Sequence, residues 1–530
     1  MCHLKLGDTK RKNMFLRRKK YPSGRTGIIV AEKVRGRMRE LCTIGVSDDP
    51  AELEVLLAKG REWIDREDAR RHPRLDLFGE NRKACEEEIM EVERVLSCIS
   101  NILLNGSDLI LDRVFDRVGF NRIEDVVFRK LVKARLSYPA SKAATVEYLK
   151  NHFDDDVDLS KIYRYLDKLG SHQQGVVQDI SVRHTMELLG GSVSVMFYDV
   201  TTLYFESDYG DDLRRTGFSK EGRHSNPQII LGLLVSLDGC PLAYCIHEGN
   251  KYEGHTMLPV IKDFAARYGL GDFIVVADSG LMSEANITEL EANGYRYIIG
   301  AKIRNESREV REWILGQEKR DCRMVEYDKG GGRRLLVGYN EDRARKDAYN
   351  REKGIRRLEK AYRSGALTKS NINRRGYNKF LTMEGEVEVS INRDRIMEDA
   401  RWDGLKGYIT NTSIPVEQVY SAYHNLWRVE RAFRIAKSKI EIRPMFHFTR
   451  RRIEAHVCIC FVALKVYKEL ERILKLAGIR LSVDKALALA QTVTTIQFKL
   501  PKNKETISKT MLMDRHQCIA KLFDENFWVT

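Results

Sequence analysis

The stretch SVSVMFYDV, residues 192–200, decides how the rest of the chain is interpreted. Its near-continuous apolar run is typical of a strand that is buried on both faces of a sheet. Two further apolar runs follow, PQIILGLLVSL at 227–237 and PLAYCIHEG at 241–249. They flank Asp238-Gly239, a dipeptide suited to a tight hairpin turn, so the three runs are predicted to form a meander.

Helical and strand-like patterns alternate after this meander. Helical periodicity runs over 255–268 and 283–293, and each helix is followed by an apolar run, FIVVAD at 273–278 and YRYIIGAKI at 295–303. The predicted order is therefore β-β-β-α-β-α-β. That is the order of the RNase H-like nuclease fold, an α/β fold in which the first and fourth strands are neighbours.

The composition favours a polyanionic partner. The 530 residues include 91 Lys and Arg against 76 Asp and Glu, a net charge of +15. No apolar run reaches the roughly 18 residues of a membrane span, and no apolar segment follows the basic N-terminus to form a signal peptide. We therefore expect a cytoplasmic protein without a membrane partner. The ten Cys include no C-x-x-C pair, so no zinc site or disulfide framework is predicted.

Changes in pattern divide the chain into six predicted segments. They are a basic β-like arm (1–50), an α-helical, DNA-binding domain (51–190), the first part of the core (191–303), a β-rich insertion (304–405), the second part of the core (406–470) and a C-terminal tail (471–530). The arm is either a nucleic-acid-binding element or a solvated hairpin, and the helical domain either binds DNA or has an ordinary surface. The insertion contains a basic helical segment, 341–375, between β-like stretches at 322–339 and 379–391.

Three acids are candidates for a metal site. Asp199 lies inside the first apolar strand, where burying a carboxylate is costly unless a cation or hydrogen bonds compensate it. Asp278 ends the fourth strand, and Glu430 lies on a predicted long helix together with Tyr423 and Lys437, each seven residues away. Each acid alone has an ordinary explanation, as a cap, a turn residue or a surface ion pair, but together they favour metal-dependent phosphodiester chemistry.

Oxygen ligands of this kind suit Mg²⁺ or Mn²⁺. Two such ions about 4 Å apart can activate the attacking oxygen and stabilise the leaving oxygen of a phosphodiester. The cofactor prediction is therefore two Mg²⁺ or Mn²⁺ ions, with the acids as ligands.

Several longer motifs resemble those of a known family. They are YDVTTLYFES (198–207), GFSKEGRHSNPQIILGLLV (217–235), EGNKYEGHT (248–256), VVADSGLMS (275–283) and YHNLWRVERAFRIAKSKIEIRPMFH (423–447). The chain resembles transposases of the IS4 superfamily, in particular the IS1634 group, from about Leu131 to Leu464. The resemblance implies a DDE triad of Asp199, Asp278 and Glu430 on an RNase H-like core, with a β-rich insertion before the Glu.

The resemblance also implies a helix motif of Tyr, Arg, Glu and Lys. Tyr423, Glu430 and Lys437 match it, but Leu426 stands at the Arg position, and Arg428 or Arg434 could cover part of its role.

Further residues are predicted to contact DNA. Lys437 is expected to meet a phosphate, and Tyr423 either bonds the DNA backbone or packs against the sheet. Trp427 either stacks on a base or, as we expect, belongs to the core. Each of these loop and insertion residues is either a DNA contact or solvated charge: Lys220, Arg223, His224, Arg343, Lys346, Arg356 and Arg357.

The function that follows is a bacterial or archaeal cut-and-paste transposase of an insertion sequence. It would bind the terminal inverted repeats of its element and the target DNA, as a homodimer in the DNA complex. A host nuclease or resolvase of the same fold would only hydrolyse, and an inactive, transposase-derived DNA-binding protein would do neither. Strand-transfer products distinguish the transposase from both alternatives.

Overall fold

The structure is a computed structural model, and its residues divide into two compact units, Met1–Cys98 and Ile99–Thr530, which are described separately. It describes residues 14–34, 36–71, 79–169, 172–207, 209–219, 222, 225–281, 283–365, 372–373, 376–384, 388–502, 504–523 and 527–528. The boundary between the units falls inside the range 51–190 that the sequence suggested as one helical domain.

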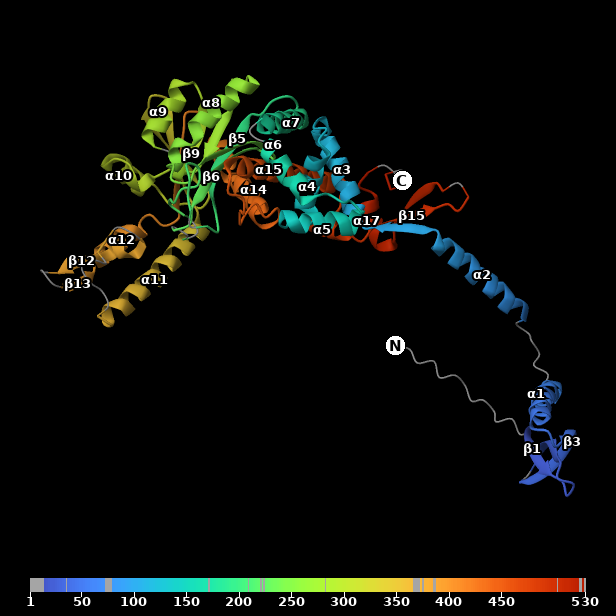
Figure 1. The fold of residues 1–530 in the computed structure, drawn as a ribbon. Helices are drawn as coiled ribbons and strands as arrows, with labels where there is room; N and C mark the ends of the chain where they lie inside the picture. Colours follow the sequence, from blue (N-terminus) through green and yellow to red (C-terminus); the bar gives the residue numbers. More distant parts are fainter. Residues whose placement is uncertain are drawn as a thin grey trace. The chain divides into compact units, whose positions relative to one another are not determined.

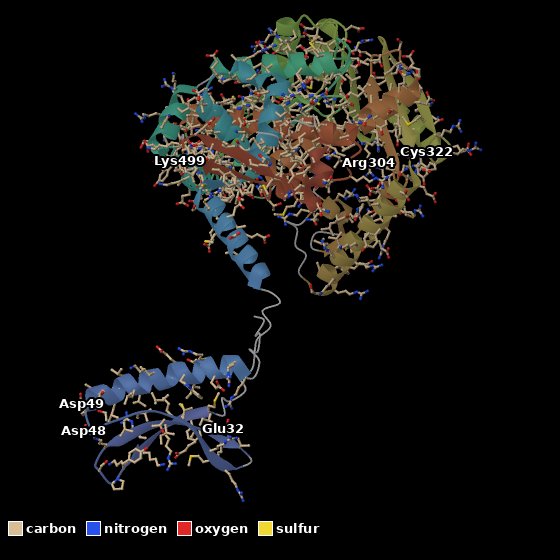
Figure 2. All side chains as sticks on the ribbon, turned by 90° about the vertical axis from the view of Figure 1, so that its right-hand side faces the viewer. Glu32, Asp48, Asp49, Arg304, Cys322 and Lys499 are labelled. Atoms are coloured by element: carbon tan, nitrogen blue, oxygen red, sulfur yellow. The ribbon has the colours of Figure 1, made fainter. Side chains whose placement is uncertain are left out.

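The first unit contains a small antiparallel sheet covered by a helix. Its strands are β1 (Met14–Lys20), β2 (Thr26–Val34) and β3 (Arg37–Ser47), and its helices are α1 (Pro50–Arg71) and α2 (Gly79–Ser97). Helix α1 lies across one face of the sheet, where Ile64 packs with Met14 and Val30 (Figure 2). In its last turn, Arg71 forms an ion pair of 2.7 Å with the buried Glu32 of β2.

The second unit begins with a strand and a group of helices. These are β4 (Ile99–Leu103), α3 (Gly106–Val118), α4 (Val126–Ser137), α5 (Lys142–Phe153), α6 (Leu159–Leu169) and α7 (His172–Leu188). Asp125 and Ser141 cap α4 and α5 by accepting hydrogen bonds from backbone N–H groups of the first turn. Helices α3, α4, α6 and α7 pack against the long, almost fully buried helix α15 (Arg450–Leu476).

The predicted α/β class is confirmed by an eight-stranded mixed sheet. Its order is β10-β11-β14-β9-β8-β5-β6-β7, and β5 is parallel to β8, which is parallel to β9. The central elements follow in the predicted sequence: β5 (Val195–Tyr204), β6 (Gln228–Ser236), β7 (Pro241–Glu248), α8 (Met257–Tyr268), β8 (Ile274–Ala277), α9 (Glu284–Ala292) and β9 (Arg296–Ala301). The first and fourth of these strands, β5 and β8, are neighbours, as the sequence predicted.

Two cores lie on opposite faces of this sheet. On one face, Tyr198 of β5 and Val275 of β8 pack against α8 and α9. On the other, Phe197 and Val276 pack against helices α13 (Val416–His424), α14 (Trp427–Ser438) and α15. Figure 1 shows α8 and α9 on one side of the strands and α14 and α15 on the other. Since successive strand side chains alternate between faces, each strand residue can be assigned to a face from its position.

The insertion contributes to the main sheet. The hairpin of β10 (Met324–Gly330) and β11 (Arg333–Tyr339) follows α10 (Arg308–Gly316) and joins the sheet through β14 (Leu405–Thr410). The rest of the insertion is α11 (Glu341–Arg363), β12 (Leu381–Glu384), β13 (Glu388–Ile391) and α12 (Arg393–Ala400), which have a small core of their own. Of the two predicted β-like stretches, only the first therefore extends the main sheet.

The C-terminal residues close a second sheet. After α15 come α16 (Val483–Ala490), β15 (Thr494–Lys499), β16 (Thr506–Met511) and α17 (Gln517–Ala520). Strand β15 pairs with both β16 and β4, so residues from the two ends of this unit share one ladder. None of the helices in the described ranges is long and apolar enough to cross a membrane.

Candidate active site

Strand register brings two of the predicted acids together. In the parallel ladder between β5 and β8, Tyr198 pairs with Ala277, so Asp199 and Asp278 each follow a paired residue. Phe197 and Val276, two residues before each acid, face α14 and α15. By the two-residue alternation of a strand, both carboxylates are on that same face.

Asp199 is half-buried and Asp278 exposed. The Asp199 Oδ1 atom accepts a hydrogen bond of 2.8 Å from the backbone N–H of Val200. This fixes one carboxylate oxygen against its own strand. The two acids therefore differ in exposure, with Asp199 inside its strand and Asp278 just after the end of β8.

Tyr423 holds the Asp278 carboxylate. Its hydroxyl donates a hydrogen bond of 3.0 Å to Asp278 Oδ1, and its side chain is only 4% exposed. Burial, followed by the charge of Asp278 and this hydrogen bond, raises the pKa of Tyr423 well above its usual value. The phenol thus stays a hydrogen-bond donor to the carboxylate. Its ring packs 4.6 Å from that of Tyr408 in β14, so of the two roles considered from the sequence the structure shows the packing against the sheet.

A glycine makes this contact possible. A Cβ atom added to Gly300 of β9 would lie 2.5 Å from the Tyr423 hydroxyl oxygen. That separation is too short for any side chain at this position, so Gly300 provides the space through which the phenol reaches Asp278. Gly300 was not predicted from the sequence, although a glycine within a buried strand is a signal of close approach.

The long helix predicted to carry Tyr423, Glu430 and Lys437 is two helices, and this prediction was wrong. Tyr423 lies in α13, and Glu430 and Lys437 lie in α14. Between them the backbone bonds tighten to three-residue spacing, as from Leu426 N to Tyr423 O at 3.0 Å. Asn425 sits at the break, and its side-chain amide donates to Ser421 O at 2.9 Å, which competes with regular helix formation.

Helix α14 brings Glu430 to the same side of the sheet. The helix packs against β5 and β6, while α13 packs against β8 and β9. Glu430 is exposed, and its charge and that of Asp278 both act on Tyr423 and on Lys406. Lys437 is half-exposed, seven residues further along α14, so it and Glu430 share a helix face.

Lys406 of β14 is a neighbour of this site that was not predicted from the sequence. Its ammonium lies 4.5 Å from the centre of the Tyr423 ring. Burial lowers the pKa of Lys406 and the charge of Arg343 lowers it further, whereas the charges of Asp278 and Glu430 oppose the shift. A lysine in an otherwise apolar strand was the available signal, since burying an ammonium is costly without a function.

The Arg position of the helix motif is filled differently here. Leu426 is buried in the core, at 7% exposure. Arg428 donates from Nε to Asn425 Oδ1 at 3.1 Å and lies 3.8 Å from Asp238, in the turn between β6 and β7. Trp427, which we expected in the core, is 43% exposed and lies against Arg428, so that expectation was wrong.

The remaining predicted DNA contacts form two groups in the sequence. Lys220, Arg223 and His224 lie outside the described residues. The other four, Arg343, Lys346, Arg356 and Arg357, are exposed side chains of α11. Only Arg343, in the first turn, is linked to the site, because its charge acts on Lys406 and Tyr408.

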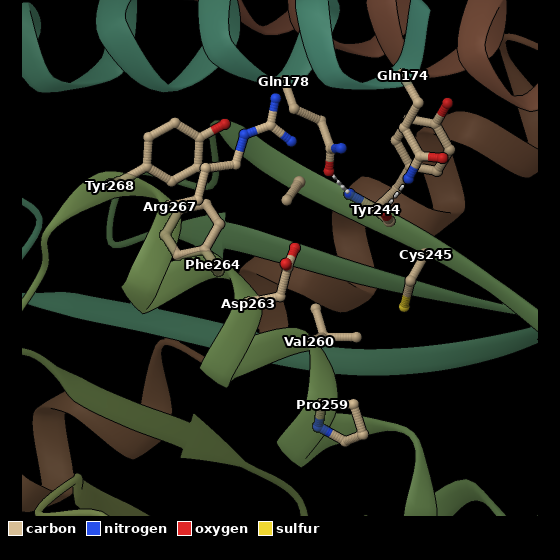
Figure 3. A pocket seen from close by; sticks show the side chains of 11 residues that line it. Gln174, Gln178, Tyr244, Cys245, Pro259, Val260, Asp263, Phe264, Arg267 and Tyr268 are labelled. Atoms are coloured by element: carbon tan, nitrogen blue, oxygen red, sulfur yellow. Dashed lines mark hydrogen bonds between the residues drawn. The ribbon is translucent and has the colours of Figure 1, made fainter. Parts of the chain in front are cut away.

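A cavity of about 220 Å³ lies away from these residues, between α7, β7 and α8 (Figure 3). Two of its glutamines bond the backbone of the edge strand β7. Gln178 accepts from Tyr244 N at 3.0 Å and Gln174 donates to Tyr244 O at 2.9 Å. These side chains cap an exposed sheet edge, so the cavity has a structural explanation.

The three acids have the type of ligand atom that a hard cation prefers. Asp199, Asp278 and Glu430 offer carboxylate oxygens, the ligands that Mg²⁺ and Mn²⁺ prefer. Within the described part of the chain, no three His, Cys, Asp or Glu side chains lie close enough to hold a metal ion together. The described geometry thus pairs Asp199 with Asp278 by register and brings Glu430 to their face of the sheet.

Comparisons with known proteins agree with this picture. A family model for the transposase DDE domain matches residues 193–465, more than half of the chain. Over 121 residues the chain is 26% identical to the transposase for insertion sequence element IS231E of Bacillus thuringiensis subsp. finitimus. That match covers 21% of this chain and 25% of the relative, so the chain matches about a quarter of that protein's length.

Among solved structures, the chain is similar to one from a cryo-EM study of the piggyBac transposase synaptic complex with hairpin DNA. The sequence identity is 10% and the TM-score 0.35, with 73% of this chain and 69% of the other covered.

Proposed function

The chain belongs to the family of proteins with a transposase DDE domain, and from this premise we propose that it is the transposase of an insertion sequence. It cuts DNA at the ends of its element and joins the freed 3′-hydroxyls to target DNA. The resemblance of its motifs to the IS4 superfamily supports this assignment and suggests the IS1634 group within it. Such a protein acts on the chromosome, in the cytoplasm of a bacterial or archaeal cell.

The observation that carries this proposal is the register of β5 and β8. It supports Asp199 and Asp278 as two members of the triad, on the face of the sheet against which the helix of Glu430 packs. The strand order β7-β6-β5-β8-β9, with three antiparallel strands followed by two parallel ones, supports an RNase H-like core.

Asp199, Asp278 and Glu430 would hold two Mg²⁺ or Mn²⁺ ions, which would supply an activated oxygen nucleophile and stabilise the leaving oxygen. Tyr423 orients the Asp278 carboxylate through its hydrogen bond to Oδ1. Lys437 contacts a phosphate of the bound strand. Lys437 and Glu430 lie on the same face of α14, so both can reach that strand.

DNA contacts outside the site come from two segments in this proposal. The N-terminal region binds the terminal inverted repeats of the element, and α11 positions the strand near the cut. A homodimer brings two element ends together in the DNA complex. Net charge of +15 supports a nucleic-acid partner for the whole chain.

Strand transfer tests this proposal. Purified protein is incubated with Mg²⁺, a supercoiled plasmid and duplexes of the DNA that flanks its reading frame, with the strand to be transferred labelled at its 5′ end. We expect labelled ends covalently joined to the plasmid. Cleavage of the duplexes without joining would identify a nuclease or resolvase instead, and DNA binding without either product would identify an inactive relative.

A further inference from the structure

Lys406 is placed beside the candidate active site by the alternation of β14. Tyr408, two residues further along the strand, packs in the core that faces α13, and its ring lies 4.6 Å from that of Tyr423. Lys406 therefore points to the same face. Its ammonium lies 4.5 Å from the centre of the Tyr423 ring and 5.7 Å from that of Tyr408, a cation–π arrangement.

A second cation reaches this place from the insertion. The start of α11 is tied to the start of β14, because Asn340 N donates to Gly404 O at 3.0 Å. The Asn340 side chain caps the helix by accepting from Arg343 N at 2.9 Å, which fixes Arg343 in the first turn. The Arg343 guanidinium is then close enough for its charge to act on Lys406 and Tyr408.

These two cations retain donor capacity. Among the described residues, no hydrogen bond or ion pair joins Lys406 to a carboxylate, although the charges of Asp278 and Glu430 act on it. Arg343 has one ion pair, with Asp347 at 3.8 Å, which is too long for a hydrogen bond. Arg351 of the same helix differs, since both of its terminal nitrogens bond the Asp403 carboxylate at 2.5 Å. An ammonium and a guanidinium that act on each other electrostatically can share the oxygens of one phosphate.

We propose that Lys406 and Arg343 together bind one phosphate of the DNA strand beside Asp278 and Glu430. This inference rests on the proposed function and deepens it, since it names the contact made by the strand that is cut. It also accounts for the buried Leu426 at the Arg position of the helix motif. The positive charge is supplied from β14 and α11 and not from the turn between α13 and α14.

The experiment scans single phosphates. End duplexes carry one neutral methylphosphonate at each position around the cut, and both cleavage and binding affinity are measured for wild type, Lys406→Met, Lys406→Arg and Arg343→Gln. Lys262→Met is the matched control, since Lys262 lies on α8 at the other face of the sheet and pairs with Glu289. Melting temperatures report whether each variant is folded.

We expect one position at which the methylphosphonate weakens wild-type binding and slows cleavage about tenfold. Lys406→Met and Arg343→Gln should each weaken binding to unmodified DNA, and neutralising that one phosphate should cost each of them less than it costs wild type, since one of its two cations is already missing. Lys406→Arg and Lys262→Met should keep the wild-type pattern. The same sensitivity in Lys406→Met as in wild type at every position would overturn the inference. If Lys406→Met does not fold, wild-type sensitivity in Arg343→Gln overturns it in the same way.

The binding scan separates this inference from the proposed function. If wild type binds the ends but does not cut them, the proposed chemistry fails while the phosphate scan still reports on Lys406 and Arg343. If wild type cuts and joins DNA but the variants show no phosphate-specific loss, the inference alone fails.

Discussion

The centre of the main sheet and helix α11 of the insertion both carry charge, but they hold it in different ways. At the centre, backbone pairing between β5 and β8 sets the positions of Asp199 and Asp278. On α11, charges lie on an exposed helix and some of them are paired with its own acids, as Arg345 is with Asp342 at 2.7 Å and Arg356 with Glu352 at 2.5 Å. Strand pairing therefore fixes the position of each carboxylate in the sheet. On the helix, the number of Lys and Arg residues overstates how many of these side chains can contact DNA.

The largest expected effect on cleavage comes from removing the carboxylates at the sheet centre and on α14. Asp199→Asn, Asp278→Asn and Glu430→Gln should each reduce cleavage at least about 10³-fold, because an amide keeps the shape of the side chain but loses the charge that holds a cation. End-duplex cleavage assays measure the loss, and affinity for the same duplex should change less than about twofold. A variant that still cut at near wild-type rate would remove its residue from the triad.

The next largest effect is the dependence of DNA affinity on salt concentration. With about six phosphates neutralised, affinity for end DNA should fall about 10³-fold between about 50 and about 200 mM salt, a slope of about −0.9 per phosphate. Fluorescence anisotropy titrations over that range measure it, and Asp199→Asn should give the same slope as wild type. A flat response would mean that the basic side chains are solvated surface only.

The insertion itself should give a smaller effect. Neutralising Arg343, Lys346, Arg356 and Arg357 together should slow cleavage about tenfold without changing which end sequence is preferred, since phosphate contacts position DNA but carry no sequence information. The control neutralises Arg308 and Arg320, which are exposed and ion-paired outside α11. Competition between end sequences reads out the preference. A changed preference would assign base recognition to α11, and an unchanged rate would leave it a structural element.

The smallest effect concerns the space between Gly300 and Tyr423. Tyr423→Phe should slow cleavage about fivefold, which corresponds to about 1 kcal/mol, the value of one ordinary hydrogen bond. Gly300→Ala should cost more, because its methyl group meets the phenol oxygen. In the Tyr423→Phe background that clash is absent, so the alanine should cost much less. A double-mutant cycle in cleavage rate and thermal stability measures the coupling, and additive effects would refute the proposed contact.

The same contrast explains what the sequence could predict. Apolar runs and a hairpin dipeptide were enough for the order of β5 to β9, because these patterns are local. The pairing of β5 with β8 was expected only because that order is the one of the RNase H-like fold. Asp199 and Asp278 followed from that order. The other residues of the site could not be predicted in this way. Lys406 reaches the site only because β14 pairs with β9 across a separation of about a hundred residues.

Local competition explains the other errors. The pattern of 416–438 is helical throughout, and nothing in its periodicity reveals that the Asn425 amide takes a backbone acceptor and divides the helix. Trp427 lies at that break, and its exposure depends on the resulting orientation of α14. The sequence pattern of β10 and β11 is that of any β-hairpin. It could not show that the hairpin joins the main sheet, because that depends on the pairing of β11 with β14.

The small sheet that joins β4 to β15 has a consequence for the order in which the protein is made. Thr495 donates to Asn105 at 2.7 Å across 390 residues, and β4 pairs with β15, so β4 gains its partner strand only after residues 494–499 have been translated. The strands that carry Asp199 and Asp278 leave the ribosome long before that. A nascent chain can thus assemble the centre of its catalytic sheet while β4 still has an open edge, and arrest of synthesis before residue 494 should leave residues 99–105 sensitive to protease in an otherwise folded sheet. Full protection of those residues in such a product would show that the ladder is not needed to order them.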